Sequence, residues 1–370
     1  KYNMIHQVPM SRLYKDVSEK VEARWKQLYS QDRPHFEGEY CKQAETLLSN
    51  ITDRKYAFIT TSGTASIHVM LLAQGIEPGD EVICVNHSAP ATAMAIASLG
   101  AKPVFVDLNE YGSMDCDQII SVVTNKTKAI LATGLYGDSY DHDKIKNIGV
   151  PILNDSCQSW LAKYKGQENA KLGIMSIVSF SSNKICPVFG TYGAVLTDDD
   201  EIAEKIKLIR RNGYAHRDVP NGIKHLGINA QPYENKCIEV LSSLEMLSKW
   251  QKIRSQISEK YDTAFEGKVT TRPKPSYSQT NYHKYTVMIP NKQLAYRKLL
   301  DLGIEARMHY TYDFSKVPVF KSKQDNQFPY TEKFIDEALS IPCSPWLNEE
   351  EQNFIIDKLI KVANGQIYSN

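Results

Sequence analysis

The 370-residue sequence predicts an α/β fold with a mostly parallel sheet, followed by a smaller α+β unit. Two observations carry this prediction. Short β-rich runs alternate with helical patterns from residue 55 to about residue 213, and the remaining C-terminal residues mix strands and helices after one long helical pattern. Strands that alternate with helices are typical of a parallel sheet covered on both faces, where ligands gather at the carboxyl ends of the strands.

Each element of the alternating part has its own pattern. The expected strands are short, apolar and rich in β-branched residues: 55–61, 80–85, 102–108, 128–136, 150–155, 175–181 and 193–198. The expected helices between them have apolar residues at helical spacing: 64–75, 91–100, 117–125 and 201–213.

A polar stretch that contains Gly and Pro, residues 218–232, ends the alternating part. Residues 234–265 then read as one long or broken helix that leads to the second unit. That unit begins near Val269, and its expected elements are a strand at 283–290, a helix at 292–303, a strand-like run at 304–310 and a closing helix at 349–364. We place the boundary at residue 250, with a large domain and N-terminal arm at 1–250 and a small domain at 251–370.

Charge and cysteine content restrict the class of protein. Lys and Arg number 44 against 43 for Asp and Glu, so no overall charge excess attracts nucleic acid or an anionic membrane. Arg210 and Arg211 are interpreted as part of a solvated helix face. The seven cysteines are scattered and odd in number, which suits reduced thiols, and no apolar run suggests a signal peptide or a membrane span. We expect a cytoplasmic protein with no nucleic-acid or membrane partner.

Three features of the alternating part together indicate a chemistry. Ser62, Gly63 and Thr64 lie between a strand and a helix, where unpaired N–H groups and hydroxyls form an anion site. Asp155 ends a strand, where a carboxylate could face a protonated ring nitrogen. The next strand delivers Ser179 and then Lys184, whose amine could form a Schiff base. Alone, these would be a helix cap, a strand-ending Asp and a surface Lys; together they suit pyridoxal phosphate (PLP).

The sequence resembles the DegT/StrS sugar aminotransferases, which are fold-type I PLP enzymes with a seven-stranded, mostly parallel sheet. The resemblance spans nearly the whole chain and is firmest in TTSGTAS, GIEPGDEVI and LGAKPVFVDL. NDSCQSW and VSFSSNK resemble the blocks that hold the pyridine ring and the reactive lysine. LGINAQ resembles a segment with which a neighbouring subunit reaches the phosphate, and HKYTVMI and GIEARMHY resemble strands of the small domain.

The resemblance implies roles for individual residues. It assigns Thr64, Ala65 and Ser179 to binding of the cofactor phosphate, and it places Gln158 near the hydroxyl of the cofactor ring. The catalytic residues that it implies are Lys184 and Asp155. It also implies that Asn229 acts across a homodimer interface and that His309 and Tyr310 lie near the mouth of the active site. Cys157 and Cys186 lie close to these residues and are interpreted as small packing residues.

Several positions depart from the family pattern. Ala89 stands where the family stacks an aromatic ring or His on the cofactor, so His87 is a candidate for that contact, or else a structural hydrogen-bonding residue. Gln231 stands where Arg is common. The turn after Lys184 carries Pro187, Thr191 and Tyr192 in place of a Gly- and acid-rich turn.

The expected reaction is ping-pong transfer of an amino group from L-glutamate to a keto sugar, with a nucleotide-linked keto-deoxy sugar as the acceptor that the resemblance implies, in polysaccharide or secondary-metabolite biosynthesis. Three alternatives stay open: an acceptor that is an unlinked ketose or keto-cyclitol, a PLP-dependent sugar dehydratase, and a non-catalytic binding protein that kept the fold. No metal is expected.

Overall fold

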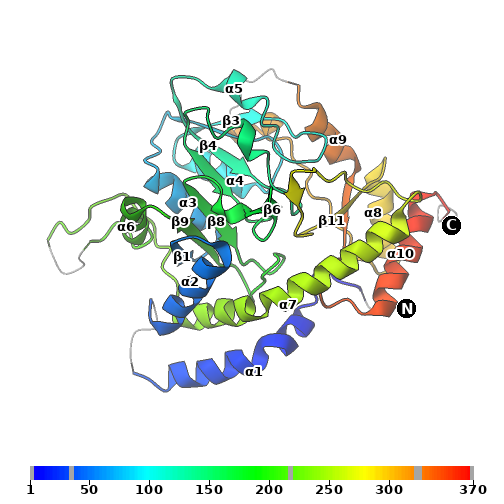
Figure 1. Ribbon diagram of the computed structural model, residues 1–370, viewed down its shortest axis with the longest axis horizontal. Helices are drawn as coiled ribbons and strands as arrows, with labels where there is room; N and C mark the ends of the chain where they lie inside the picture. Colours follow the sequence, from blue (N-terminus) through cyan, green and yellow to red (C-terminus); the bar gives the residue numbers. More distant parts are fainter. Residues whose placement is uncertain (1–3, 33–36, 216–219, 321–326, 367–370) are drawn as a thin grey trace.

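A seven-stranded sheet forms the centre of the computed structural model (Figure 1). The structure describes residues 4–32, 37–215, 220–320 and 327–366. Strand β9 runs antiparallel to both of its neighbours, β1 and β8, and the other neighbouring strands are parallel. The mostly parallel sheet is therefore confirmed. In spatial order the strands are β1 (Tyr56–Thr60), β9 (Gly193–Thr197), β8 (Met175–Ser179), β5 (Ile152–Asp155), β4 (Thr127–Thr133), β2 (Glu81–Val85) and β3 (Lys102–Val106).

Helices cover both faces of this sheet because successive strand residues point to opposite sides. Phe58 and Val195 pack on the face covered by α3 (Gly63–Ala73), α4 (Ala91–Ser98) and α6 (Asp200–Ile209). Ala57 and Ala194 pack on the opposite face, against α2 and α7. The helices on this second face are α2 (Glu39–Thr52), α5 (Ile119–Val122) and α7 (Glu234–Phe265).

Helix α7 is a single helix of 32 residues that passes from one unit to the other (Figure 1). Its first half, with Val240 and Leu244, packs under the sheet, and its second half, with Ile257 and Tyr261, packs in a separate core of the C-terminal unit. The boundary proposed at residue 250 lies between these two halves, inside the helix.

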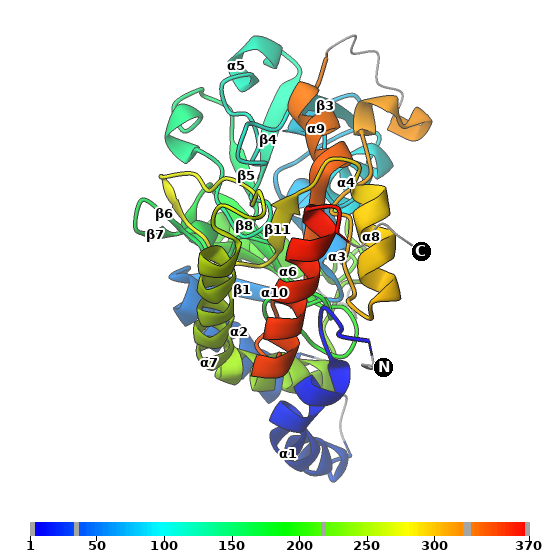
Figure 2. The same ribbon diagram turned by 90° about the vertical axis from the view of Figure 1, so that its right-hand side faces the viewer.

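The C-terminal unit has a small antiparallel sheet with helices beside it (Figure 2). The expected strand at 283–290 is present as β11. The strand-like run expected at 304–310 forms isolated bridges, including Arg307 to Ser340, but no continuous strand. The partner of β11 is β12, which the sequence patterns did not reveal. The elements are β11 (Tyr285–Met288), α8 (Lys292–Asp301), α9 (Pro329–Glu337), β12 (Ala338–Ile341) and α10 (Glu349–Ala363).

Two N-terminal helices were also not anticipated. Helix α1 (Met10–Tyr29) lies along α7 and buries Leu13, Val17 and Val21, whose spacing of four residues is the helical signal that could have found it (Figure 1). Before α1, Ile5 forms a bridge with Ile304 and enters the core of the C-terminal unit. The N-terminal arm is thus attached to the small unit as well as to the large one.

The end of α6 corrects one expectation. Arg210 is buried and is not on a solvated face. Its guanidinium donates to Glu45 at 2.6 Å and to the carbonyl of Ile59 at 2.8 Å. It also forms an ion pair with Glu37 at 3.3 Å. Carboxylates from two other segments compensate the burial of this charge. Arg211 is half-exposed, as expected for its face.

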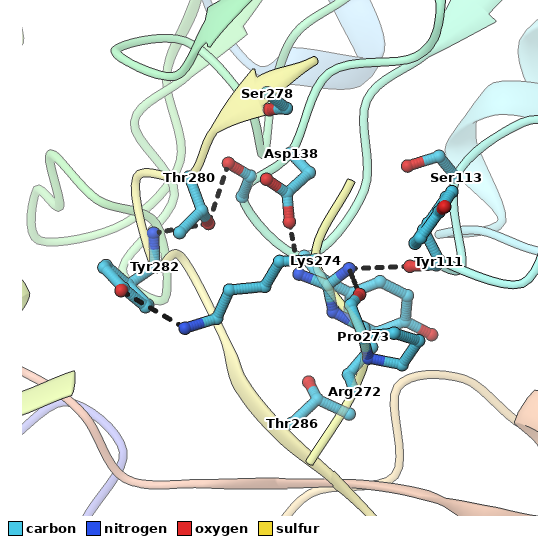
Figure 3. A network of polar contacts seen from close by, with 12 residues as sticks. Tyr111, Ser113, Asp138, Arg272, Pro273, Lys274, Ser278, Thr280, Tyr282 and Thr286 are labelled. Atoms are coloured by element: carbon cyan, nitrogen blue, oxygen red, sulfur yellow. Dashed lines mark hydrogen bonds and ion pairs between the residues drawn. The ribbon is translucent and has the colours of Figure 1, made fainter. Parts of the chain in front are cut away.

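A polar network ties the two units together (Figure 3). Arg272, on the segment that leads to β11, pairs with the buried carboxylate of Asp138 in the loop after β4 and donates to the carbonyl of Tyr111 at 2.6 Å. Nearby, the Asn281 amide donates to the carbonyls of Gln158 and Trp160 at 3.0 and 2.8 Å. These contacts hold the start of the small unit against the edge where the parallel strands end. The short strands β6 (Lys163–Tyr164), β7 (Gln167–Glu168) and β10 (Ser278–Gln279) form a separate sheet beside it.

Candidate active site

The carboxyl ends of β1, β5 and β8 lie at one edge of the sheet and open into a cavity of about 180 Å³. Of the residues singled out from the sequence, Ser62, Gly63, Thr64, Ala89, Asp155, Cys157, Gln158, Ser179, Lys184 and Thr191 line this cavity. Sequence reasoning did not find Thr133, although it ends β4 at the same edge, nor Thr92, Ser181 and Ile67.

The first wall of the cavity is the N-terminus of α3. Ser62 is the N-cap, and its hydroxyl accepts the N–H of Ala65 at 3.0 Å. A Cβ at Gly63 would lie 3.1 Å from the hydroxyl of Ser179, so the absence of a side chain lets the helix end approach β8. The result is a cradle of N–H and hydroxyl groups that suits an anion. Ala65 itself does not line the cavity, and its N–H is engaged by the cap.

Asp155 lies in the cavity wall at the end of β5 and is almost fully buried. The hydroxyl of Thr92 donates to one carboxylate oxygen at 3.1 Å, and the backbone N–H of Cys157 donates to the other at 3.2 Å. Two donors therefore fix the orientation of the carboxylate. Burial, together with the negative charge of Asp155, raises the pKa of the Cys157 thiol, which makes it a poor nucleophile.

Gln158 connects the cavity to the C-terminal unit. Its side-chain carbonyl accepts the N–H of Tyr136 at 3.1 Å, and its amide donates to the hydroxyl of Tyr310 at 3.0 Å. Tyr310 does not line the cavity but contacts a residue that does.

His87 lies behind the cavity rather than in its wall. It is fully buried, and burial lowers its pKa to about 4, so the ring is neutral near pH 7. One ring nitrogen accepts the N–H of Tyr310 at 3.1 Å and the other donates to the carbonyl of Tyr312 at 3.0 Å, a tautomer assigned from these partners. This placement favours the structural alternative for His87. Ala89 does line the cavity, and no aromatic side chain lines it among the residues that the structure describes.

Lys184 lies in the turn after β8, where its N–H donates to the carbonyl of Ser181 at 2.9 Å. Its side chain reaches the same cavity as Asp155 and Ser179. Pro187 and Tyr192, from the unusual turn that follows, contact the core and α7 instead: the hydroxyl of Ser243 donates to the carbonyl of Pro187 at 2.8 Å. Cys186 is buried in that core.

Asn229 and His309 also lie outside the cavity. Asn229 is exposed in the loop before α7, where its backbone forms a bridge with Arg211. His309 lies at a second cavity beside the first, and its ring contacts the hydroxyl of Ser340 at 3.0 Å. Within the described residues, no cluster of His, Cys, Asp or Glu could hold a metal ion, and no helix there is both long and apolar enough to span a membrane.

Comparison with known proteins identifies the chain. The model of the DegT/DnrJ/EryC1/StrS aminotransferase family matches residues 16–360. The chain belongs to this family. Members of the DegT/StrS family depend on PLP, so the enzyme is a PLP-dependent aminotransferase. The residues around the cavity fit this cofactor, because an anion cradle, a carboxylate and a lysine face one space.

Individual relatives are similar over most of their length. A pleiotropic regulatory protein of Geobacillus stearothermophilus is 33% identical over 87% of this chain and 89% of its own. A UDP-2-acetamido-2-deoxy-3-oxo-D-glucuronate aminotransferase of Pseudomonas aeruginosa is 29% identical over 83% and 86%. Among solved structures, DesV of S. venezuelae in complex with a ketimine intermediate matches with a TM-score of 0.92 at 23% identity over the whole of both chains, which shows the shared fold.

Proposed function

We propose that this chain transfers an amino group from L-glutamate to a keto sugar that is linked to a nucleotide, as a cytoplasmic homodimer. The observation that carries the chemistry is the single cavity shared by Lys184, Asp155 and the anion cradle. The acceptor class follows from the relative in Pseudomonas aeruginosa, whose name gives a UDP-linked 3-oxo sugar as the substrate.

The chain's own residues supply binding and proton transfer. When bound, PLP supplies an electron-withdrawing ring that makes the substrate carbon acidic. Ser62, Thr64 and Ser179 would hold the phosphate. Asp155, oriented by Thr92 and the N–H of Cys157, would keep the ring nitrogen protonated. Lys184 would anchor the cofactor, then take the proton from the donor's carbon and return it as a general acid.

The dimer has its own support. Asn229 lies outside the cavity of its own chain, and the loop before α7 exposes Ile223, Leu226 and Tyr233. Exposed apolar side chains of this size, grouped on one segment, are typical of an interaction surface. A second subunit that covers this segment would receive Asn229 in its active site.

Two other functions compete with this one. A dehydratase would use the same cofactor, but the presence of Lys184 in the cavity favours transamination. A regulatory role without chemistry is suggested by the name of the relative in Geobacillus stearothermophilus. It is disfavoured because the cradle, Asp155 and Lys184 are all present and face one space.

The test is an absorption spectrum of the protein with PLP, before and after L-glutamate, for the natural chain and for Lys184→Ala. We expect a visible band from lysine-bound cofactor that glutamate converts to the spectrum of pyridoxamine phosphate, and no such band in the variant. A natural chain without the band would favour the regulatory alternative. A band unaffected by glutamate would mean another donor or another PLP reaction.

A further inference from the structure

A second cavity, of about 390 Å³, lies beside Lys184. One wall is the turn that carries Lys184, with Ser182 and Asn183, and another is the small unit. The N-terminal arm closes a third side. Its lining residues are Gln7, Val8, Met10, Ser182, Asn183, Lys284, Glu305, Arg307 and His309. We call this space the Lys284 cavity.

The amine of Lys284 is the most unusual group of the Lys284 cavity. Lys284 is only 6% exposed, and its amine donates to the carbonyl of Asn183 at 3.3 Å. Among the described residues, no carboxylate forms an ion pair with it. Burial lowers its pKa to about 7, and the charges of Lys184 and Arg254 act in the same direction. The amine is thus held in a site that lacks a counter-charge.

The surroundings add further positive charge. Arg307 lines the same space and pairs with Glu305, the one acidic residue among the described lining residues. Behind the wall, Arg254 is buried, and its Nε and one terminal nitrogen have no hydrogen-bond partner among the described atoms. His309 is neutral near pH 7, because burial and then the charges of Lys284 and Lys184 lower its pKa, so it offers no counter-charge. Cationic groups therefore exceed anionic ones around the Lys284 cavity.

A buried cation without a partner is costly, whereas a cation that meets an anion in a charge-assisted hydrogen bond is stabilised. The cradle at Ser62 and Ser179 provides separately for the cofactor phosphate, so the surplus charge here serves another group. We propose that the Lys284 cavity binds a carboxylate of a substrate, with Lys284 and Arg307 as its partners. This proposal rests on the proposed function, because it places that carboxylate next to the amine of Lys184.

Either substrate could bring the carboxylate: the dicarboxylic amino donor, or an acceptor sugar that carries an acid group. Binding probes that cannot react separate the two. Glutarate has the two carboxylates of glutamate without its amine. Methyl β-D-glucuronide carries a sugar acid, and methyl β-D-glucoside is its neutral counterpart.

The experiment is titration calorimetry of each probe into PLP-loaded protein, with the natural chain, Lys284→Met, Lys284→Arg and Lys333→Met. Lys333 is exposed on α9 and controls for the loss of one positive charge. We expect Lys284→Met to weaken the binding of a carboxylate probe by ~10-fold or more, with Lys284→Arg restoring most of it and Lys333→Met leaving it unchanged. Near-identical circular dichroism and Tm values verify that each variant is folded.

The outcomes separate cleanly. Loss of glutarate binding assigns the cavity to the amino donor, and loss of glucuronide binding alone assigns it to the acceptor. Equal affinity in the natural chain and Lys284→Met, or no binding of either acid by the natural chain, overturns the proposal. If the acids bind as expected but L-glutamate leaves the absorption spectrum of the PLP-loaded protein unchanged, only the proposed function is contradicted.

Discussion

Asp155 is the residue whose charge matters most in the proposed chemistry. Asp155→Asn keeps the shape and the contacts with Thr92 and Cys157 but removes the negative charge that holds a proton on the ring nitrogen. We expect the glutamate half-reaction to slow by ~10²–10³-fold, while the affinity for PLP changes much less. Stopped-flow absorbance gives the rate, and a spectroscopic titration gives the affinity. An equal loss in both quantities would contradict the electrostatic role.

His87 makes stability depend on pH. Its pKa is lowered to about 4 by burial, from an ordinary value of 6.5, so the unfolded chain binds a proton that the folded chain does not between these values. Stability should therefore fall as the pH decreases from 6.5 to 4, by about 3 kcal/mol for this one residue. In His87→Gln the urea midpoint should fall less between pH ~7.5 and pH ~5 than in the natural chain. If the urea midpoints of the two chains fall equally between these pH values, His87 is already charged in the folded state.

The residues at the strand ends could be predicted because their position follows from the chain itself. Ser62, Asp155 and Ser179 each follow an apolar run of a parallel sheet, and such runs end at one edge. Lys284 could not be found in this way. Its place beside Lys184 depends on how the small unit packs against the large one, and a lone lysine in a strand pattern carries no sign of that packing.

At the scale of elements, the contact between Arg272 and Asp138 fastens the segment before β11 to the loop after β4 (Figure 3). Arg272→Met would leave a fully buried carboxylate without its partner, and we expect a loss of about 3–5 kcal/mol in the free energy of unfolding. Replacing Asp138 with Asn as well should recover part of this loss. Urea denaturation measures both.

Lys274 provides the matched control for that pair. It lies two residues away and pairs with Asp262, but both side chains are partly exposed. Lys274→Met should therefore change the free energy of unfolding by less than about 1 kcal/mol. If the two single variants are equally destabilised, the burial of the Arg272 pair does not determine its contribution.

Some elements could not be predicted from the sequence. Helices α1 and α2 precede the first expected strand, and β12 is only four residues long, Ala338–Ile341. A short apolar run of this kind does not distinguish a strand from a buried helix segment. Its pairing with β11 comes from tertiary packing, which also reduces 304–310 to isolated bridges.

At the scale of the whole molecule, the proposed dimer can be tested by mixing subunits. In a dimer of Lys184→Ala and Asn229→Ala subunits, one site lacks both residues and the other is complete, provided that Asn229 acts on the opposite chain. Randomised mixtures of two inactive variants should regain roughly a quarter of the natural activity. Light scattering checks that subunits exchange as dimers. Exchanged mixtures without recovery would place Asn229 in its own chain's site, and an active Asn229→Ala variant would place it outside any site.

Finally, α7 and the aromatic residues of the C-terminal part affect how this chain could acquire a new substrate preference. The helix belongs to two cores at once, and Phe314, Phe320 and Phe328 of the C-terminal part are buried in the core of the large unit. A chimera that took residues 251–370 from a relative would thus join two different sequences inside a continuous helix. It would also replace part of the core of the large unit with side chains of the relative. Recombination between relatives at this point should yield misfolded products, so new specificity would arise more readily by point substitutions in the cavity walls.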